Sequence, residues 1–226
     1  MQNLKVIYED NHIIVVEKTP NIPSQSDKTG DIDMLTLVKQ YIKEKYNKPG
    51  NVYLGLVHRL DRPVGGIMIF AKTSKAASRL SDQVREKVFK KKYLAVVDGK
   101  IENKSGTLED YLYKDERNNI SKVVNKGKKN AKFAKLDYDV IKYDEVKNLS
   151  LVKVNLHTGR HHQIRVQLSN FGHSIFGDQK YGTRGQGKQI ALWAYELTIN
   201  HPITKEEMTF KNLPESVGTW CILRNR

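Results

Sequence analysis

The sequence has little cysteine and no long apolar run, and both absences exclude classes of protein. Cys221 is the only cysteine among 226 residues, so neither a disulfide framework nor a cysteine-based zinc site can form. No apolar stretch reaches the roughly 20 residues that span a bilayer, and residues 1–10 lack the basic segment and apolar core of a secretion signal. We therefore expect a cytosolic protein that does not bind membranes.

Acidic residues are few relative to basic ones, with 25 Asp and Glu against 39 Lys and Arg and a formal net charge of +14. This excess indicates a polyanionic partner. Nucleic acid is the first choice, because basic surfaces gain affinity by neutralising phosphates and releasing counterions. The lysines are spread over strand-like and helix-like stretches, which disfavours an amphipathic membrane-surface helix. A lysine-rich composition without functional meaning is the alternative.

The balance of expected elements predicts the fold class. A hydrophobic content of 38% over 226 residues supports a real core, and no linker is evident, so we expect a single domain over residues 1–226. Strand-like stretches outnumber helix-like ones and no strand–helix–strand rhythm recurs, which predicts an α+β fold with a mainly antiparallel sheet. The expected strands cover residues 4–8, 13–17, 67–70, 93–97, 135–140, 149–156, 190–199 and 207–210.

Three helices are predicted from capping residues that precede apolar residues at helical spacing. Asp33 and Thr73 are the expected N-caps of the first two, and Thr158 caps a third that starts near Arg160. The faces that these helices bury are expected to carry Leu35, Val38 and Ile42, then Ala77, Leu80, Val84 and Val88, then Ile164, Leu168 and Phe171.

One charged segment, residues 57–66, carries the residue types from which catalytic sites are built. It sets the carboxylate of Asp61 between Arg59 and Arg62 and ends in a pair of glycines. Nearby positive charge favours the ionised carboxylate, which can act as a nucleophile or a base but not readily as an acid. The glycines allow a ligand or another backbone segment to approach closely. An ordinary surface turn is the alternative interpretation.

Two other basic stretches suggest contacts with an anion. The lysine-rich residues 122–135 predict an exposed loop or hairpin suited to phosphate contacts. Arg160 and Arg165 fall near the positive end of the third predicted helix, a combination that attracts anions. The three histidines of residues 157–162 raise the question of a metal, but no Glu follows the first of them and no third ligand is evident.

Three segments together resemble the RluA/RluD-type pseudouridine synthase family. They are His58-Arg59-Leu60-Asp61 with Gly66, Lys91-Lys92-Tyr93-Leu94-Ala95, and His157-Thr158-Gly159-Arg160-His161-His162-Gln163-Ile164-Arg165. The turn from Gly177-Asp178 to Tyr181-Gly182 and the pair His201-Pro202 fit as well. The likeness covers nearly the whole chain. It departs from the family at Val64-Gly65, where relatives often have Thr-Ser, and at Trp193, where they often have His.

The resemblance implies an RNA pseudouridine synthase that isomerises specific uridines in ribosomal or transfer RNA without a cofactor or metal. Asp61 would be the catalytic aspartate, Tyr93 the tyrosine that stacks on the target base, and Arg165 the arginine paired with the aspartate. The implied fold has a mainly antiparallel central sheet, flanking helices and an RNA-binding cleft, and no N-terminal S4-like RNA-binding domain is expected. The implied RNA-binding residues are Arg59, Arg62, Arg160, His162 and Gln163.

The expected partner is thus an RNA stem-loop, with no obligate protein partner and a monomeric chain. Two alternatives remain open. A non-catalytic RNA-binding protein of the same fold would keep the basic surface only. A metal-dependent hydrolase would use the histidine cluster.

Overall fold

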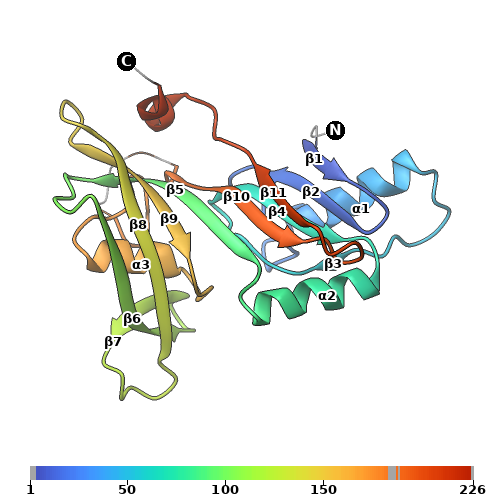
Figure 1. The fold of residues 1–226 in the computed structure, drawn as a ribbon, viewed down its shortest axis with the longest axis horizontal. Helices are drawn as coiled ribbons and strands as arrows, with labels where there is room; N and C mark the ends of the chain where they lie inside the picture. Colours follow the sequence, from blue (N-terminus) through green and yellow to red (C-terminus); the bar gives the residue numbers. More distant parts are fainter. Residues whose placement is uncertain (1–3, 183–186, 188, 225–226) are drawn as a thin grey trace. The chain divides into compact units, whose positions relative to one another are not determined.

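The computed structural model describes residues 4–182, 187 and 189–224 (Figure 1). The chain divides into two compact units, a first unit of Met1–Lys90 with Ala194–Leu213 and a second unit of Lys91–Trp193 with Pro214–Arg226. Each unit combines antiparallel strands with helices, which confirms the predicted α+β class. The expectation that residues 1–226 act as one domain stays a prediction.

The first unit is built on a sheet in the order β1 (Val6–Glu9), β2 (Ile13–Lys18), β4 (Gly65–Ala71) and β10 (Leu192–Asn200), which enters this unit at Ala194. The antiparallel β1–β2 hairpin and the strand after Asp61 are both as predicted. At the margins, the short β3 (Gly55–Leu56) pairs with β4, and β11 (Glu207–Lys211) pairs with β10.

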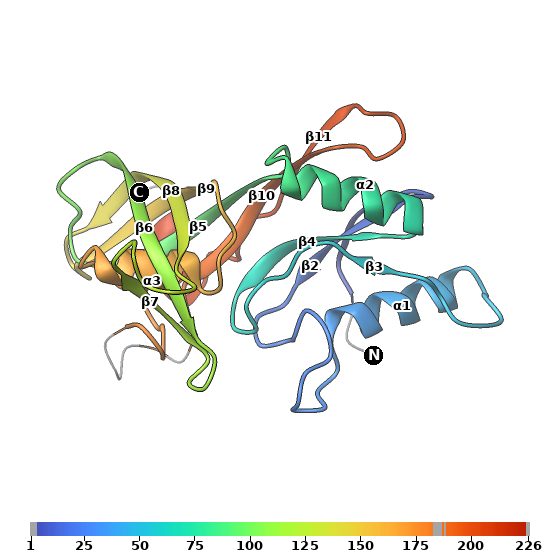
Figure 2. The same cartoon turned by 90° about the horizontal axis from the view of Figure 1, so that it is seen from below.

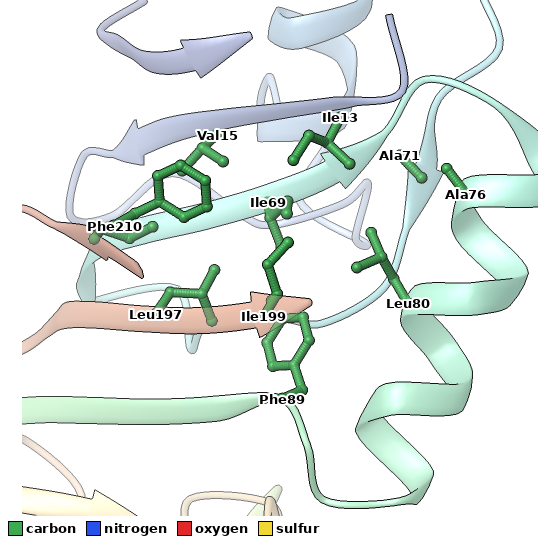
Figure 3. Close-up of a cluster of buried hydrophobic side chains, with 11 residues drawn as sticks. Ile13, Val15, Ile69, Ala71, Ala76, Leu80, Phe89, Leu197, Ile199 and Phe210 are labelled. Carbon is green, nitrogen blue, oxygen red and sulfur yellow. The ribbon is translucent and has the colours of Figure 1, made fainter. Parts of the chain in front are cut away.

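Helices α1 (Met34–Lys45) and α2 (Ser74–Arg85) lie on opposite faces of this sheet (Figure 2). Successive side chains of a strand point to opposite faces, so a strand between two helices must be apolar at every position. That explains the continuous apolar run of β2. The cluster on the α2 face is shown in Figure 3 and includes Ile13, Val15, Ile69, Ala76 and Leu80.

Both predicted N-caps of the first unit are confirmed. The side chain of Asp33 accepts a hydrogen bond from Thr36 N (3.1 Å), and that of Thr73 accepts one from Ala76 N (3.2 Å). Each bond satisfies a backbone donor that has no partner within its helix. The local sequence therefore determines where α1 and α2 begin.

The residues that these two helices bury differ in part from the predicted ones. In α1, Met34 is buried with Val38 and Ile42, and Leu35 is only half-buried. In α2, the polar Gln83 is buried and Val84 is exposed.

Gln83 is buried because its side-chain amide satisfies the backbone at the end of β10. Its Nε2 donates to the carbonyl of Asn200 (2.7 Å), and its Oε1 accepts from the N–H of the same residue (2.9 Å). A pattern of apolar residues cannot reveal a glutamine that is buried for its hydrogen bonds.

The second unit holds an antiparallel sheet in the order β5 (Lys90–Asp98), β9 (Leu149–Leu156), β8 (Lys132–Asp144), β6 (Ser105–Asp115) and β7 (Ile120–Val124). The lysine-rich residues 122–135 form the end of β7, the start of β8 and the connection of residues 125–131, of which residues 125–130 are exposed, and this agrees with the predicted exposed loop or hairpin. A 3-10 helix, η1 (Gly218–Leu223), lies near the end of the described chain.

Helix α3 (Gln163–Asn170) begins later than predicted, at Gln163 rather than near Arg160. His162 occupies the N-cap position with a left-handed φ of 52° and makes no side-chain cap. The predicted cap, Thr158, instead donates its hydroxyl to Gln163 Oε1 (2.7 Å). Val166 packs α3 against Leu112 of β6 and Ala134 of β8.

Candidate active site

The segment that carries Asp61 is anchored on both sides in the first unit. His58 is buried and its Nε2 accepts a hydrogen bond from the N–H of Ile69 in β4 (3.1 Å). Leu60 is also buried, and the hydroxyl of Ser24 accepts from its N–H (3.1 Å) and donates to its carbonyl (2.8 Å). Because residues 58 and 60 point inward, the half-buried Asp61 side chain is held in a fixed backbone frame.

A buried lysine supports the other side of the same segment. The Nζ of Lys18 donates to the carbonyls of Val64 (2.6 Å), Arg62 (2.8 Å) and Thr19 (3.3 Å). Burial lowers the pKa of Lys18 to about 7, while the negative charge of Asp61 acts in the opposite direction. Lys18 is a supporting residue that the sequence did not predict, although its even register with the inward Ile14 and Val16 of β2 is a signal for its burial.

Arg62 has several partners in residues 21–31. It donates from Nε to the carbonyl of Asn21 (3.1 Å) and forms ion pairs with Asp31 and, at 3.5 Å, with Asp27. These pairs are exposed, and such pairs contribute only about 0–1 kcal/mol. Because these ion pairs are weak, an RNA phosphate at Arg62 would replace the carboxylates at little cost in free energy. The RNA contact of Arg62 stays a prediction.

The predicted close approach at the glycine pair is confirmed at Gly66. Its φ is +123°, and a Cβ there would lie 2.2 Å from the carbonyl oxygen of Ala194 in β10. A side chain would meet backbone that cannot move aside, so only glycine fits. Gly66 also stands opposite Lys18 in the β2–β4 ladder, which ties the Asp61 segment to the centre of the sheet.

Tyr93 and Arg165 belong to the second unit. Tyr93 is a buried residue of β5 and pairs with Val154 of β9. Arg165 lies on α3 with 4% of its side chain exposed, and it forms a bidentate ion pair with the fully buried Asp178, with both bonds at 2.7 Å. The sequence predicted that an anion would bind near Arg165. Within this unit, that anion is the carboxylate of Asp178. The predicted pairing of Arg165 with Asp61 stays a prediction.

The three RNA-binding residues predicted near α3 differ in their surroundings. Arg160 is exposed and donates from Nε to the carbonyl of Phe133 (2.9 Å), which leaves its guanidinium within reach of solvent. His162 is buried, its Nδ1 lies 2.8 Å from Tyr181 Oη, and burial lowers its pKa to about 2.

Gln163 makes its hydrogen bonds inside the unit. Its Oε1 accepts from Thr158 Oγ1 and Arg160 N, and its Nε2 donates to the carbonyl of Lys135 and to Gln167 Oε1. A side-chain amide has two donors and two acceptor sites, so these bonds use its capacity. This environment favours a role in holding residues 158–163 in shape over the RNA contact that the resemblance implied.

Each of the histidines that suggested a metal has a hydrogen-bonding partner in the protein. His157 pairs with Asp137 (2.5 Å), His161 Nδ1 lies 3.0 Å from Ser121 Oγ, and His162 Nδ1 lies 2.8 Å from Tyr181 Oη. Among the described residues, no three His, Cys, Asp or Glu side chains are grouped so that they could hold a metal ion. The hydrolase alternative therefore gains no support from the geometry.

The described part of the chain contains no helix that combines the length and apolar character needed to cross a membrane.

Comparisons with known proteins point to one family. A sequence model of the family described as RNA pseudouridylate synthase matches residues 12–170, a stretch that includes Asp61, Tyr93 and Arg165. The dual-specificity RNA pseudouridine synthase RluA of Haemophilus influenzae is 33% identical over 217 residues, which cover 92% of this chain and 91% of that protein. The uncharacterized RNA pseudouridine synthase YhcT of Bacillus subtilis is 33% identical over 90% of this chain and 66% of its own length.

Solved structures agree on the fold. The human RNA pseudouridylate synthase domain containing 1 protein has a TM-score of 0.78 at 24% identity, covering 97% of this chain and 86% of the other. The domain containing 4 protein has a TM-score of 0.77 at 21% identity, over 93% and 89% of the two chains. Several of the similar proteins are longer, and this chain spans between 63% and 72% of their length. The chain belongs to the RluA type of the RNA pseudouridylate synthase family.

Proposed function

We propose that this chain isomerises uridine to pseudouridine in RNA, with Asp61 as the nucleophile. The observation that carries the proposal is the family match over residues 12–170, a range that contains all three predicted catalytic residues, Asp61, Tyr93 and Arg165. The net charge of +14 supports an RNA substrate, since the binding of a polyanion needs a basic surface. The anchoring of residues 58–64 also supports the proposal, because a reacting group must be held in a fixed position.

The chemistry requires one covalent catalyst. The N1–C1′ glycosidic bond breaks, uracil turns, a C5–C1′ bond forms, and the proton on C5 is lost while N1 gains one. No redox change occurs and no group is supplied from outside, so the reaction needs no cofactor or metal. A glycosidase uses two carboxylates because it handles a water, whereas this reaction must exclude water. A single carboxylate, Asp61, captures the ribose or the base while uracil is held.

Tyr93 and Arg165 complete the proposed reaction. The target nucleotide leaves its stack to reach a carboxylate of the protein, and Tyr93 lies against the exposed base. Arg165 orients the carboxylate of Asp61, because a guanidinium binds a carboxylate in a defined geometry.

The decisive assay for the activity uses RNA with uridine tritiated at C5. Loss of the C5 proton releases tritium, so the proposal predicts release in proportion to pseudouridine formed. A non-catalytic RNA-binding protein would bind the same RNA and release none. A chelator separates the third possibility, since a metal-dependent hydrolase would lose its activity and this isomerase would keep it.

The RNA substrate is proposed at the level of class. Ribosomal and transfer RNA stem-loops both fit the catalytic set, and the name of the Haemophilus influenzae relative speaks of dual specificity. Mapping pseudouridines in cells with and without the gene would identify the site. We further propose a cytoplasmic monomer that uses Arg59, Arg160 and the lysine-rich hairpin for phosphate contacts.

The β7–β8 connection tests the proposed RNA surface. Replacing Lys126, Lys128 and Lys129 with Gln lowers the net charge from +14 to +11, and we expect the slope of log affinity against log salt to fall by about 2–3. Filter binding at several salt concentrations measures that slope.

A matched control replaces three exposed lysines of the first unit, Lys43, Lys48 and Lys75. The control removes the same charge and should retain most of the slope. Equal losses in the two triple variants would show that the hairpin has no special part in RNA binding.

A further inference from the structure

The turn of residues 177–182 fits the family pattern, yet the proposed reaction gives it no task. Asp178 in this turn forms the bidentate ion pair with Arg165, and its Oδ1 also accepts from the N–H groups of Lys180 (2.9 Å) and Tyr181 (3.2 Å). These bonds fix the carboxylate in one orientation. Both side chains of the ion pair are buried, at 4% and 0% exposure.

The turn also contacts the face of the same guanidinium. The Cζ of Arg165 lies 5.2 Å from the ring centroid of Tyr181, a distance at which a cation is attracted to an aromatic face. The ring is held in turn, because Tyr181 Oη accepts from the N–H of Ser121 (2.6 Å) and lies 2.8 Å from His162 Nδ1. The guanidinium is thus fixed at one edge and over one face.

The shape of the turn is set by its backbone. Gly177 has a φ of +74°, and a Cβ there would lie 2.2 Å from the carbonyl oxygen of Gln189. The backbone on either side of Asp178 also closes on itself, because the N–H of Asp178 donates to the carbonyl of Ile175 (3.1 Å) and that of Gly182 donates to the carbonyl of Asp178 (2.9 Å). The carboxylate is therefore placed by a rigid turn.

Stability alone does not explain this arrangement. Taking two charges out of water costs about as much as their attraction returns, so a buried ion pair is weak evidence of stabilisation. The guanidinium of arginine is planar, and it can bind a second anion in one geometry only if the orientation of this plane is fixed. A bidentate carboxylate fixes the orientation of the plane. His162 adds no competing charge beside Arg165, because burial lowers the pKa of His162 to about 2 and keeps it neutral.

We infer that Asp178 and Tyr181 are positioning residues, which orient the Arg165 guanidinium so that it acts on the catalytic carboxylate and the target nucleotide. The inference rests on the proposed function. Asp178 holds the Nε and Nη2 nitrogens, which turns the Nη1 side of the guanidinium away from the turn.

The test is a double-mutant cycle between Asp178→Asn and Arg165→Met, measured as the single-turnover rate of tritium release at saturating enzyme. If Asp178 acts through Arg165, Asp178→Asn lowers the rate about 10–100-fold in the wild-type background, as supporting residues of active sites commonly do. It lowers the rate less than about 3-fold in the Arg165→Met background. The dissociation constant for RNA should change less than about 3-fold throughout.

Thermal unfolding of each variant separates positioning from folding. A merely structural role would lower the rate by the same factor in both backgrounds, and that result would overturn the inference, as would a wild-type rate in Asp178→Asn. Should Asp178→Asn fail to fold, Tyr181→Leu takes its place, because it removes the aromatic face and keeps the ion pair. Its effect should likewise vanish in the Arg165→Met background, and an equal effect there would overturn the inference. No tritium release by the wild-type chain would instead contradict the proposed function.

Discussion

We expect replacement of Asp61 with Asn to abolish tritium release from C5-labelled RNA, with a loss of roughly 10³-fold or more, because removal of the proposed nucleophile leaves only binding to assist the reaction. The dissociation constant for RNA should stay within about threefold of the wild-type value, since the side chain keeps its size and the basic residues around it are unchanged. Single-turnover kinetics and filter binding on the same preparations measure both quantities.

The structure provides a reason to expect that this variant folds. The frame around position 61 is made by His58, Leu60 and Lys18 through bonds that do not involve the Asp61 side chain. The backbone bond from the N–H of Val64 to the carbonyl of Asp61 (2.9 Å) is also unaffected. Asp61→Ala is the second variant, and substantial turnover by either one would show that the nucleophile is elsewhere.

The second large effect concerns Lys18 and the pH dependence of folding. Burial lowers the pKa of Lys18 to about 7, whereas its ordinary value is 10.5. Between these values the unfolded chain holds a proton that the folded chain has lost, so the free energy of unfolding rises with pH across this window. At about 1.4 kcal/mol per pH unit between the two pKa values, the rise amounts to as much as about 5 kcal/mol. Below pH 7 the burial of the charge opposes folding in full.

Urea unfolding of the wild type and of Lys18→Met from pH 6 to pH 10 measures this contribution. Methionine does not titrate, so the variant should lose this part of the rise and become relatively less stable as pH increases. Other lysines and tyrosines titrate equally in both proteins and cancel in the difference. Parallel curves for the two proteins would show that Lys18 is not buried in the way described.

Lys18 also links folding to the proposed catalytic carboxylate of Asp61. The negative charge of Asp61 opposes the effect of burial on the Lys18 pKa. Asp61→Asn should therefore lower the pKa of Lys18 further, and the rise in stability should begin at a lower pH than in the wild type. A single variant thus gives one readout in activity and another in folding.

The parts of the fold that the sequence predicted are those set by local chemistry. Asp33 and Thr73 cap their helices because the required bond is made to a donor three residues along the chain. Alternating or continuous apolar runs likewise predicted most strands. Where a tertiary contact decides, the prediction fails, as at α3, where the Thr158 hydroxyl accepts from the N–H of Lys135 in β8 (2.9 Å) instead of capping a helix.

The residues that support the candidate site could not be predicted from local sequence patterns. Ser24 is a small polar residue in a loop, and only the folded chain shows that it holds Leu60 by two bonds. Asp178 belongs to a turn that the family pattern includes, but its partner on α3 is set by the tertiary structure. Residue type and spacing predict Asp61 as a candidate because its neighbours in sequence carry the signal, and that role stays a prediction.

The central claim is that the side chain at position 61 meets a nucleotide that has left its stack. A crystal structure of the Asp61→Asn variant with a substrate RNA stem-loop measures this directly, because that variant should bind RNA without turnover. We expect a target uridine outside the helix, with its C1′ or base carbon about 3–3.5 Å from the side chain at position 61. We also expect Arg165 within hydrogen-bond distance of that side chain. A stacked uridine, or one that lies against other residues with position 61 remote from the RNA, would contradict the account.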